Sequence, residues 1–508
     1  MKTKYFLLGL AALGFAACSE PIDDTTSINP IGGGTKGYLA IDLKSSDDVV
    51  RAATDTYEDG TAAEQTISCA TFYFFDQAGK AFNVNSSGNY VYVPVTDNGG
   101  EAEPNIESMT NPVLVVEKYK GQFPSSVVAV LNYEGKSSQS LEDLKTVLKG
   151  EGHSDGAKFI MTNSVYKNAA GKEVDATPLT IDHFHTTSDK ALGSPVTIYV
   201  ERMTAKVSVV AGQTAFDTKV AMGDEAVYAK ILGWDLVSNQ TKSYFVKTID
   251  PTWTDDELGF AWNNAPYYRS YWTKKCVNGA VDNEFAYNDL TNGVGAIEYT
   301  GEQVEVDPRA KYVVAAELQD KDGKALEIAQ WYGTNYAGEA ALKVAVAATL
   351  QNKFMQFDGV STYTSIDDDQ LQCVAGMTGA ESYEVKFQLA QNVPTTNWYS
   401  FDGSTYTAID INAELAKLEP AKIWKSGMTY YYADIKHLAN EKGKVGEYGV
   451  VRNHSYKVNI EGVKGWGTPV YDPSQNVVPV KPTDKETYIA AKINVLSWRV
   501  VSHNVTLE

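Results

Sequence analysis

Short apolar segments separated by turn residues recur along the whole chain, and they restrict the fold more than any other feature. Early examples are TISCATFYFFD (66–76), NYVYVPV (89–95), NPVLVVEKY (111–119) and SSVVAVLNYEG (125–135). Runs of this length, bounded by Gly, Pro, Asn or Asp, are typical of β-strands. The 31 tyrosines and 40 glycines among the 508 residues also favour strands and turns over helices. We therefore predict a mainly β protein with two β-sandwich-like domains and a few short helices.

The strand-like segments fall into two groups, which predict an N-terminal β domain at 52–205 and a C-terminal β domain at 206–466. The first group closes with KFIMTNSVY and SPVTIYVERMTAKVSVV, and the second includes VYAKILGWDLV, ALKVAVAATL and HSYKVNIEGV. One helix is predicted at 140–150, where Ser140 and Asp143 can cap the first turn and Gly150 can end it. A second short helix is predicted at about 410–418, and no repeat of fixed period is evident.

The net charge of the chain and the spacing of its cysteines and histidines limit the ligands and partners that it can bind. The formal net charge is −20, which argues against nucleic acid or anionic lipid as a partner. Cys69, Cys276 and Cys373 lie far apart without CxxC spacing, so buried thiols are expected rather than a disulfide framework or a zinc site. His183 and His185 could share one face of an extended segment, but no third ligand is identifiable. No metal and no cofactor are therefore expected.

The N-terminus, MKTKYFLLGLAALGFAACSE, predicts a secretory signal peptide over residues 1–17. Lys2 and Lys4 precede an apolar run that is too short to span a membrane, and small residues precede Cys18. A cysteine directly after such a small pair is typical of a lipoprotein signal, so we expect a lipid such as palmitate on the Cys18 thiol. One lipid anchor would hold the precursor at a membrane without a transmembrane helix. An ordinary signal with an incidental cysteine is the alternative.

The segment 18–51 is predicted to hold a tether, one strand and an isolated arginine. In GYLAIDLKSS, the apolar residues Leu39, Ile41 and Leu43 alternate with smaller or polar ones, which indicates a half-buried strand. The polar stretch that follows carries Arg51, and the next arginine in the chain is Arg202. A single arginine in an exposed loop is either a solvated charge of no importance or an accessible site for a trypsin-like protease.

The C-terminal end is predicted to be an extended linker at 467–487 followed by apolar strands at 488–508. The linker is rich in proline and lacks a core pattern. The strands change phase between Val495 and Leu496, which is typical of a bulge or a tight turn. Apolar residues that could enter a neighbouring sheet are Ile489, Ala491, Ile493, Val495, Leu496, Trp498, Val500, Val501, Val505 and Leu507. Such strands could pair with another chain or pack back on their own domain, and both possibilities stay open here.

Several of these segments together resemble one family. KSGMTYYYADIKHL (425–438), YGVVRNHSYKVNIEGVKGWGTP (448–469) and NVLSWRVVSHNVTLE (494–508) are similar to the C-terminal signature of the FimA/Mfa1 fimbrillins, subunits of the type V fimbriae of Bacteroidetes. TIYVERMTAKVSVV (197–210) and LGFAACSE (13–20) resemble two further segments of that family. The proline-rich linker before the last strands makes the Mfa1 branch the nearest resemblance.

The resemblance implies a two-domain, transthyretin-like β fold and a route of assembly. The subunit would be exported as a lipoprotein, through Cys18, to the outer membrane and cell surface. An arginine- or lysine-specific protease would then cut between Arg51 and Ala52 and release the strand that carries Leu39, Ile41 and Leu43. The C-terminal donor strands of the next copy would fill the groove. Partners implied are other copies, fimbrial anchor and tip subunits, and a host protein or glycan, with a membrane contacted only through the lipid of the precursor.

The most direct function for these features is a structural fimbrial subunit, of the shaft, that supports adhesion. Two alternatives from the same system are a tip or accessory adhesin and an anchor that keeps its lipid and first strand. A third is a glycan-binding surface lipoprotein that uses an aromatic platform. An enzyme is not expected: GHSDG (152–156) follows a predicted helix rather than the strand that a nucleophile elbow requires, so no catalytic residue is assigned.

Overall fold

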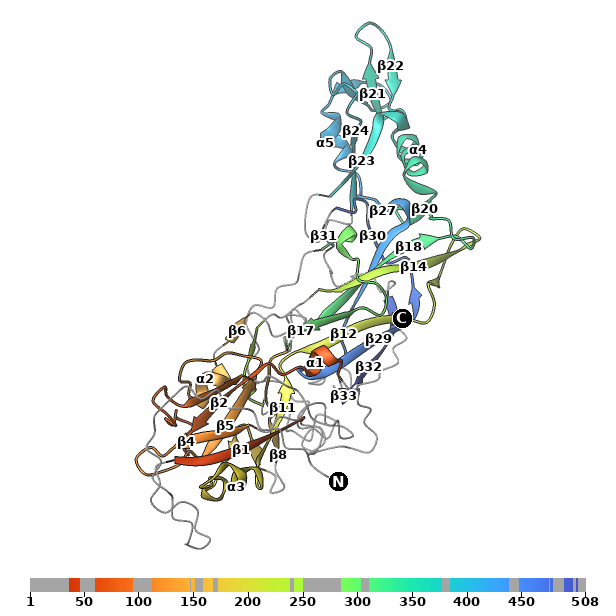
Figure 1. The fold of residues 1–508 in the computed structure, drawn as a ribbon. Helices are drawn as coiled ribbons and strands as arrows, with labels where there is room; N and C mark the ends of the chain where they lie inside the picture. The colour runs from red at the N-terminus through yellow and green to blue at the C-terminus, as the bar shows by residue number, and fades with distance from the viewer. Residues whose placement is uncertain are drawn as a thin grey trace.

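The computed structural model confirms the prediction of a mainly β protein. Most of its elements are strands, and the helices are short (Figure 1). Among the described residues, no helix is long and apolar enough to cross a membrane. The residues that the structure describes are 36–45, 60–94, 112–146, 148–150, 159–167, 172–237, 242–249, 285–302, 310–376, 384–437, 447–474, 476–477, 488–496 and 499–500.

The N-terminal end of the molecule is built on one eight-stranded sheet. Its order is β3-β2-β5-β7-β11-β1-β4, and β10 pairs with β5. Side chains alternate across the sheet, so that Phe72 and Phe74 of β2 enter one hydrophobic cluster while Tyr73 and Phe75 enter another. The strands are β1 (Lys36–Ser45), β2 (Cys69–Phe75), β3 (Tyr90–Pro94), β4 (Val113–Glu117), β5 (Ser126–Leu131), β7 (Met161–Asn163), β10 (Thr177–Pro178) and β11 (Val196–Arg202).

Two five-stranded sheets form the middle of the molecule. Their orders are β17-β12-β29-β32, with β33 paired to β29, and β13-β14-β18-β28-β30. Inward side chains of both sheets, among them Val209, Trp234 and Val458, belong to one hydrophobic cluster. The strands are β12 (Ala205–Ala211), β17 (Ile297–Thr300), β29 (His454–Lys464), β32 (Tyr488–Leu496), β33 (Arg499–Val500), β13 (Ala215–Met222), β14 (Glu225–Leu236), β18 (Lys311–Gln319), β28 (Met428–Asp434) and β30 (Thr468–Pro469).

The chain between the neighbouring strands β18 and β28 forms a separate unit, residues 328–424, which we call the distal body. It has its own hydrophobic cluster around Trp398 and Leu342, and it makes the upper end of the molecule in Figure 1, away from β1. Its elements are β19 (Ile328–Trp331), β20 (Thr334–Tyr336), α4 (Gly338–Leu350), β21 (Phe354–Phe357), β22 (Tyr363–Ser365), β23 (Leu371–Ala375), β24 (Val385–Leu389), β25 (Trp398–Phe401), β26 (Tyr406–Ala408), α5 (Ile411–Leu415) and β27 (Lys422–Trp424).

The described helices agree only in part with those predicted. Helix α2 (Leu141–Thr146) begins after Ser140 as expected, with the Asp143 amide donating to the Ser140 hydroxyl at 3.1 Å. It stops before residue 148, because Leu148–Gly150 form strand β6 and pair with β15 (Lys242–Tyr244), so the prediction of a helix to residue 150 is wrong. Helix α5 confirms the second predicted helix. ALKVAVAATL (341–350) lies in helix α4, so the prediction of a strand there is wrong. The remaining short elements are α1 (Ala62–Gln65), α3 (Ser188–Leu192), β8 (Tyr166–Lys167), β9 (Glu173–Val174), β16 (Phe285–Ala286) and β31 (Asn476–Val477).

Replacing Trp398 by alanine should unfold the distal body selectively. The side chain is 1 % exposed, and its indole nitrogen donates to the Pro394 carbonyl at 2.8 Å. We expect the free energy of unfolding of this body to fall by about 3–5 kcal/mol, measured as faster amide hydrogen exchange in 328–424 with unchanged exchange in β2 and β5. Val344→Ala on the exposed face of α4 is the control and should change little. Unaltered exchange in the distal body would contradict its having a separate core.

Candidate functional site

Strand β1, which contains the residues predicted to form the removable strand, lies inside the N-terminal sheet. It pairs in parallel with β11, with Ile41 opposite Val196, and antiparallel with β4, with Leu39 opposite Leu114. Beyond these ladders, the Ile41 amide donates to the Pro112 carbonyl at 2.9 Å. Residues 36–40 pair with β4 and residues 41–45 with β11, so removal of β1 would leave backbone groups of both neighbours without partners.

The side chains of β1 are buried in the core of this sheet. Leu39, Ile41 and Leu43 are each 0 % exposed, and they share a hydrophobic cluster with residues of β2, β4, β5 and β11. Burial of side chains of this size contributes about 1.5–3 kcal/mol each. Ala40 and Asp42 are buried as well, so the strand is not half-buried as its pattern predicted. Helix α3 lies against β1, which a local pattern cannot reveal.

The predicted lipid and cleavage residues lie outside the part of the chain that the structure describes. Cys18, Arg51 and Ala52 are in the undescribed ranges 1–35 and 46–59. Their assignment stays a prediction. The description resumes at Gly60, directly before helix α1.

Helix α1 is attached to the second domain by a buried carboxylate that the sequence analysis missed. Glu64 is 0 % exposed. Its Oε2 accepts from the Thr61 amide at 2.6 Å, its Oε1 accepts from the Tyr299 hydroxyl at 2.7 Å, and both oxygens lie 3.3 Å from Lys206 Nζ. Arg202 Nε also donates to the Glu64 carbonyl at 2.9 Å. The Thr-x-x-Glu capping pattern in TAAE, residues 61–64, was the available signal.

The charges around Glu64 keep its carboxyl ionised. Burial alone would raise the pKa of Glu64, but the Lys206 ammonium and the hydrogen bonds lower it by more, so the pKa lies below its ordinary value of 4.5. Helix α1, which follows the predicted cleavage site in the sequence, is therefore held by residues of β11, β12 and β17. Strand β1 precedes that site.

The C-terminal strand pairs with its own chain in this structure. Strand β32 runs antiparallel to β29, from Tyr488 opposite Lys464 to Leu496 opposite Ser455, with one irregularity between Ile460 and Gly462. Of the residues predicted to form donor strands, Ile489, Ala491, Ile493, Val495 and Leu496 belong to β32 and Val500 to β33. Trp498, Val501, Val505 and Leu507 lie outside the described residues. Packing on the chain's own domain was the alternative that the sequence left open.

The histidines and cysteines form no metal site in the described part of the chain. No group of three or more His, Cys, Asp and Glu side chains there could hold a metal ion. His185 forms a backbone bridge with Tyr38 of β1, and His183 Nδ1 accepts from the Thr180 amide at 3.0 Å. Cys69 and Cys373 are buried and form no disulfide, as predicted, whereas Cys276 lies outside the described residues.

Comparison with known proteins identifies the C-terminal part of the chain. Residues 422–504, which include β28, β29 and β32, match the family described as "Major fimbrial subunit protein type IV, Fimbrillin, C-terminal". Over these residues the chain is similar to the C-terminal part of the fimbrillins, a family of fimbrial subunits. The match confirms the resemblance to fimbrillins, while the assignment to the Mfa1 branch stays a prediction. No curated protein sequence matches the chain.

Solved structures of fimbrial and adhesion proteins are similar at low identity. A candidate cell adhesion protein from Parabacteroides distasonis has a TM-score of 0.43 at 11 % identity over 92 % of this chain and 98 % of its own. The fimbrilin FimA of Porphyromonas gingivalis has a TM-score of 0.37 at 16 % identity, over 91 % and 98 %. The tip fimbrial protein Mfa3 of Porphyromonas gingivalis has a TM-score of 0.30 at 10 % identity, over 91 % and 100 %. We draw no conclusion about function from these scores.

Replacing Glu64 by glutamine should destabilise the chain more at neutral pH than in acid. At pH 7 the variant leaves Lys206 buried without its carboxylate, which costs about 3 kcal/mol. Because the folded-state pKa of Glu64 is lowered, its stabilising effect is present above pH 4.5 and is lost as the pH falls through that lower pKa. Urea unfolding at pH 7 and pH 3 measures the effect, with the exposed Glu225→Gln as control. An equal loss at both pH values would sink the ion-pair explanation.

Proposed function

We propose that the protein is a structural subunit of the shaft of a cell-surface fimbria and that it polymerises by donor-strand exchange. The observation that carries the proposal is the position of β1: it lies between β11 and β4, pairs with both, and buries Leu39, Ile41 and Leu43 completely. The fimbrillin match over residues 422–504 also supports a fimbrial role, and it includes most of the C-terminal segment that would donate the replacement strand.

The proposed sequence of events begins with export as a lipoprotein through Cys18 to the outer surface. Cleavage between Arg51 and Ala52 then detaches the lipid and β1, while the capped helix α1 stays attached through Glu64. Residues 488–507 of the next copy enter the groove between β4 and β11. Each subunit is thus acceptor at one end and donor at the other. Such head-to-tail contacts do not close on themselves and therefore build a filament.

The energetics favour refilling the groove. Loss of β1 would expose the surface that buries Leu39, Ile41 and Leu43, together with backbone groups of two neighbouring strands. Unpaired backbone groups and exposed apolar surface are both costly, and an exposed sheet edge is a template for an added strand. The scheme needs no catalytic residue, cofactor or metal, and we propose that the protein is not an enzyme.

Three other functions remain as alternatives to this proposal. A tip adhesin would accept a strand without donating one, and an anchor would keep its lipid and its first strand. A glycan-binding surface lipoprotein would also stay uncut. The N-terminus of the protein at the cell surface distinguishes these roles. A shaft or tip subunit would be cut there, whereas an anchor or a glycan-binding lipoprotein would stay uncut.

Substitution of Arg51 tests the cleavage step. For the wild-type chain taken from the cell surface, we expect an N-terminus at Ala52 and an intact mass without lipid, because a trypsin-like pocket requires the arginine or lysine side chain. Arg51→Gln should accumulate with an acylated Cys18 and without polymer, whereas Arg51→Lys, which keeps the cation, should remain a substrate for a protease that accepts both. A wild-type chain that starts at acylated Cys18 would instead favour an anchor or a ligand-binding lipoprotein.

Deletion of residues 488–508 tests the donor role. The cleaved, truncated subunit should remain monomeric, since it can accept a strand but has none to offer. Added to intact cleaved subunits, it should shorten the polymers by capping their acceptor ends, and this capping also shows that the truncated chain is folded. Polymer length is measured by gel electrophoresis without heating. Polymerisation of the truncated chain by itself would rule out these strands as donors.

A further inference from the structure

Strands β1 and β32, near opposite ends of the chain, carry similar sequences. Residues 38–43 read YLAIDL and residues 488–493 read YIAAKI. The tyrosine and the first alanine recur, and isoleucine stands in place of both leucines. Both segments form strands, but they belong to different sheets. The likeness indicates that β32 has the side chains needed to occupy the place of β1.

The place that β1 fills restricts side-chain size on both faces of the strand. Leu39, Ile41 and Leu43 lie in the apolar core of the sheet. Ala40 alternates with them and is also 0 % exposed, in a strand against which α3 packs. Because protein interiors are close-packed, a side chain larger than alanine fits there only if its neighbours move. Many residues satisfy the apolar positions, so Ala40 is the stricter requirement for a replacement strand.

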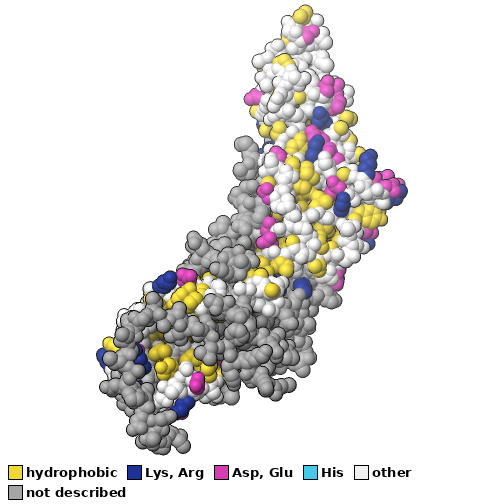
Figure 2. Space-filling view, in the orientation of Figure 1, with side chains coloured by type: hydrophobic (Ala, Val, Ile, Leu, Met, Phe, Trp, Pro, Cys, Tyr) yellow, Lys and Arg dark blue, Asp and Glu magenta, His cyan; other side chains and the backbone are white. Residues whose placement is uncertain are grey.

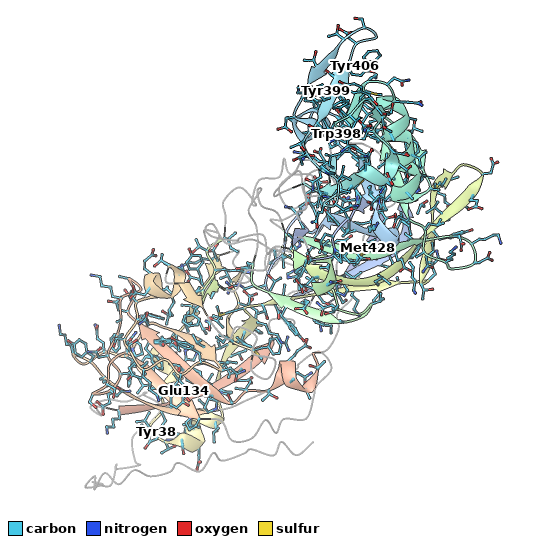
Figure 3. All side chains as sticks on the ribbon, turned by 90° about the horizontal axis from the view of Figure 1, so that it is seen from above. Tyr38, Glu134, Trp398, Tyr399, Tyr406 and Met428 are labelled. Atoms are coloured by element: carbon cyan, nitrogen blue, oxygen red, sulfur yellow. The ribbon has the colours of Figure 1, made fainter. Side chains whose placement is uncertain are left out.

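The place of Tyr38 is less restricted. Its amide donates to the His185 carbonyl at 2.8 Å, and the His185 amide donates back at 2.8 Å. The side chain is half-buried and lies at the end of the molecule opposite to Trp398 (Figure 3). A replacement strand could therefore carry residues of several sizes at this position.

Ala40 selects one register for β32. If β32 enters in the direction of β1, strand alternation keeps its apolar residues inward only in registers that differ by two residues. In one of them Ala490 falls on the place of Ala40. A shift by two residues puts Lys492 there in one direction and Tyr488 in the other. A buried ammonium without a partner is costly, and tyrosine has no room in a place shaped for alanine.

Gly37 supports the same register independently. It is buried and opposite Val116 of β4. In the register that matches the two alanines, Thr487 falls on its place, whereas the shifted registers bring Lys485 or Ile489 there. Threonine is the smallest of the three and therefore the easiest to accommodate.

The second apolar phase of the C-terminus fits less well. Residues 496–500 could place Ser497 where Ala40 lies, which satisfies the size requirement. The same register puts Trp498 on the place of Ile41, which is 0 % exposed. Indole is much larger than the isoleucine side chain, so this alternative overfills the core.

Entry of β32 in the opposite direction is also unfavourable. With Ala490 on the place of Ala40, the reversed strand would bring Thr487 to the place of Leu43. A hydroxyl would then lie in the apolar core, where burial without a hydrogen bond is costly.

The preferred register has one unfavourable contact, at the surface. Lys36 Nζ lies 3.3 Å from Glu117 Oε1, and both side chains are about half exposed. Charged side chains of both signs surround this end of the molecule (Figure 2). Glu486 would take the place of Lys36 and meet Glu117. Exposed pairs contribute little in either sense, so the buried positions decide the register.

We propose that residues 488–493 of one copy replace residues 38–43 of the next in this register, and that Ala490 fixes it. The inference rests on the proposed function, because β1 must first have left. Ala491 then takes the place of Ile41 and leaves part of its volume empty. The donor strand therefore fills the groove less completely than β1 does.

Disulfide cross-linking within assembled fimbriae tests the register. Val113 lies opposite Ala40 in the β1–β4 ladder, so Val113→Cys should cross-link with Ala490→Cys of the neighbouring copy. Directly opposed residues are within reach of a disulfide, whereas those displaced by two residues are not. A ladder of covalent oligomers on a non-reducing gel, abolished by a reductant, is the expected result.

Matched donors report the other registers from the same acceptor. Tyr488→Cys, Lys492→Cys and Ser497→Cys, each combined with Val113→Cys, should give no ladder. Glu117→Cys with Glu486→Cys should give one, and it would not do so if the strand entered in reverse. Val113→Cys alone, and the Ala490→Cys pair in an uncut Arg51→Gln chain, are the controls and should remain without cross-links.

The two adjacent alanines of β32 should respond in opposite ways to enlargement. Ala491→Ile should slow dissociation of the fimbriae in urea at least about tenfold, because it refills the place of Ile41. Ala490→Leu should speed dissociation by a similar factor, because the place of Ala40 has no room. In the register shifted toward Lys492, Ala490 would lie at the place of Tyr38 and Ala490→Leu would be tolerated.

The outcomes separate the register from the assembly itself. A ladder from position 488, 492 or 497 instead of 490 would overturn the register and leave the donor role intact. Fimbriae that give no ladder from any of these donors would overturn the donor role of these strands, and the register with it. Ala490→Leu fimbriae as stable as the wild type would likewise contradict the proposed register.

Discussion

The N-terminal sheet depends on the two-sided pairing of β1. Its neighbours β11 and β4 do not pair with each other, so this one strand joins them. Ile41, 0 % exposed, also fills the core between them. Loss of this strand would be costly and its replacement favourable, because the vacated place offers backbone partners on two neighbouring strands and an apolar floor. If the loop after β1 is cut as proposed, the core of the sheet itself would supply free energy for association.

The buried ion pair of Glu64 and Lys206 fixes the chain that follows the predicted cut, whereas β1 precedes the cut and would leave. Breaking a buried pair costs several kcal/mol, and here the carboxylate is held additionally by the Tyr299 hydroxyl and by the Thr61 amide. Helix α1 therefore remains on the second domain whether or not β1 is present. Under the proposed function, the groove would open without loosening the junction between the domains.

The sequence predicted elements with a local signature and missed those that depend on distant partners. The alternation of Leu39, Ile41 and Leu43 was enough to predict a strand, and Asp410 was enough to mark the start of α5. The burial of Asp42 and the strand at Leu148–Gly150 were not predictable, because they depend on packing by α3 and on pairing with β15. The similar segments FDGVSTYTSID (357–367) and FDGSTYTAID (401–410) are an intermediate case: both can be seen in the sequence, but the stacking of Tyr363 on Tyr406 depends on the three-dimensional structure.

The positions of β1 and β32 bear on the direction that donor-strand exchange would take under the proposed function. In the described part of the chain β32 is an edge strand, paired on one side with β29, whereas β1 pairs with β4 through residues 36–40 and with β11 through residues 41–45. A strand that left the edge of its own sheet and entered the vacated place would pair with two strands instead of one, and it would cover the apolar surface that buries Leu39, Ile41 and Leu43. While β1 is present that place is filled, so no second strand can enter it. In this scheme the cleavage step would set when the subunits associate.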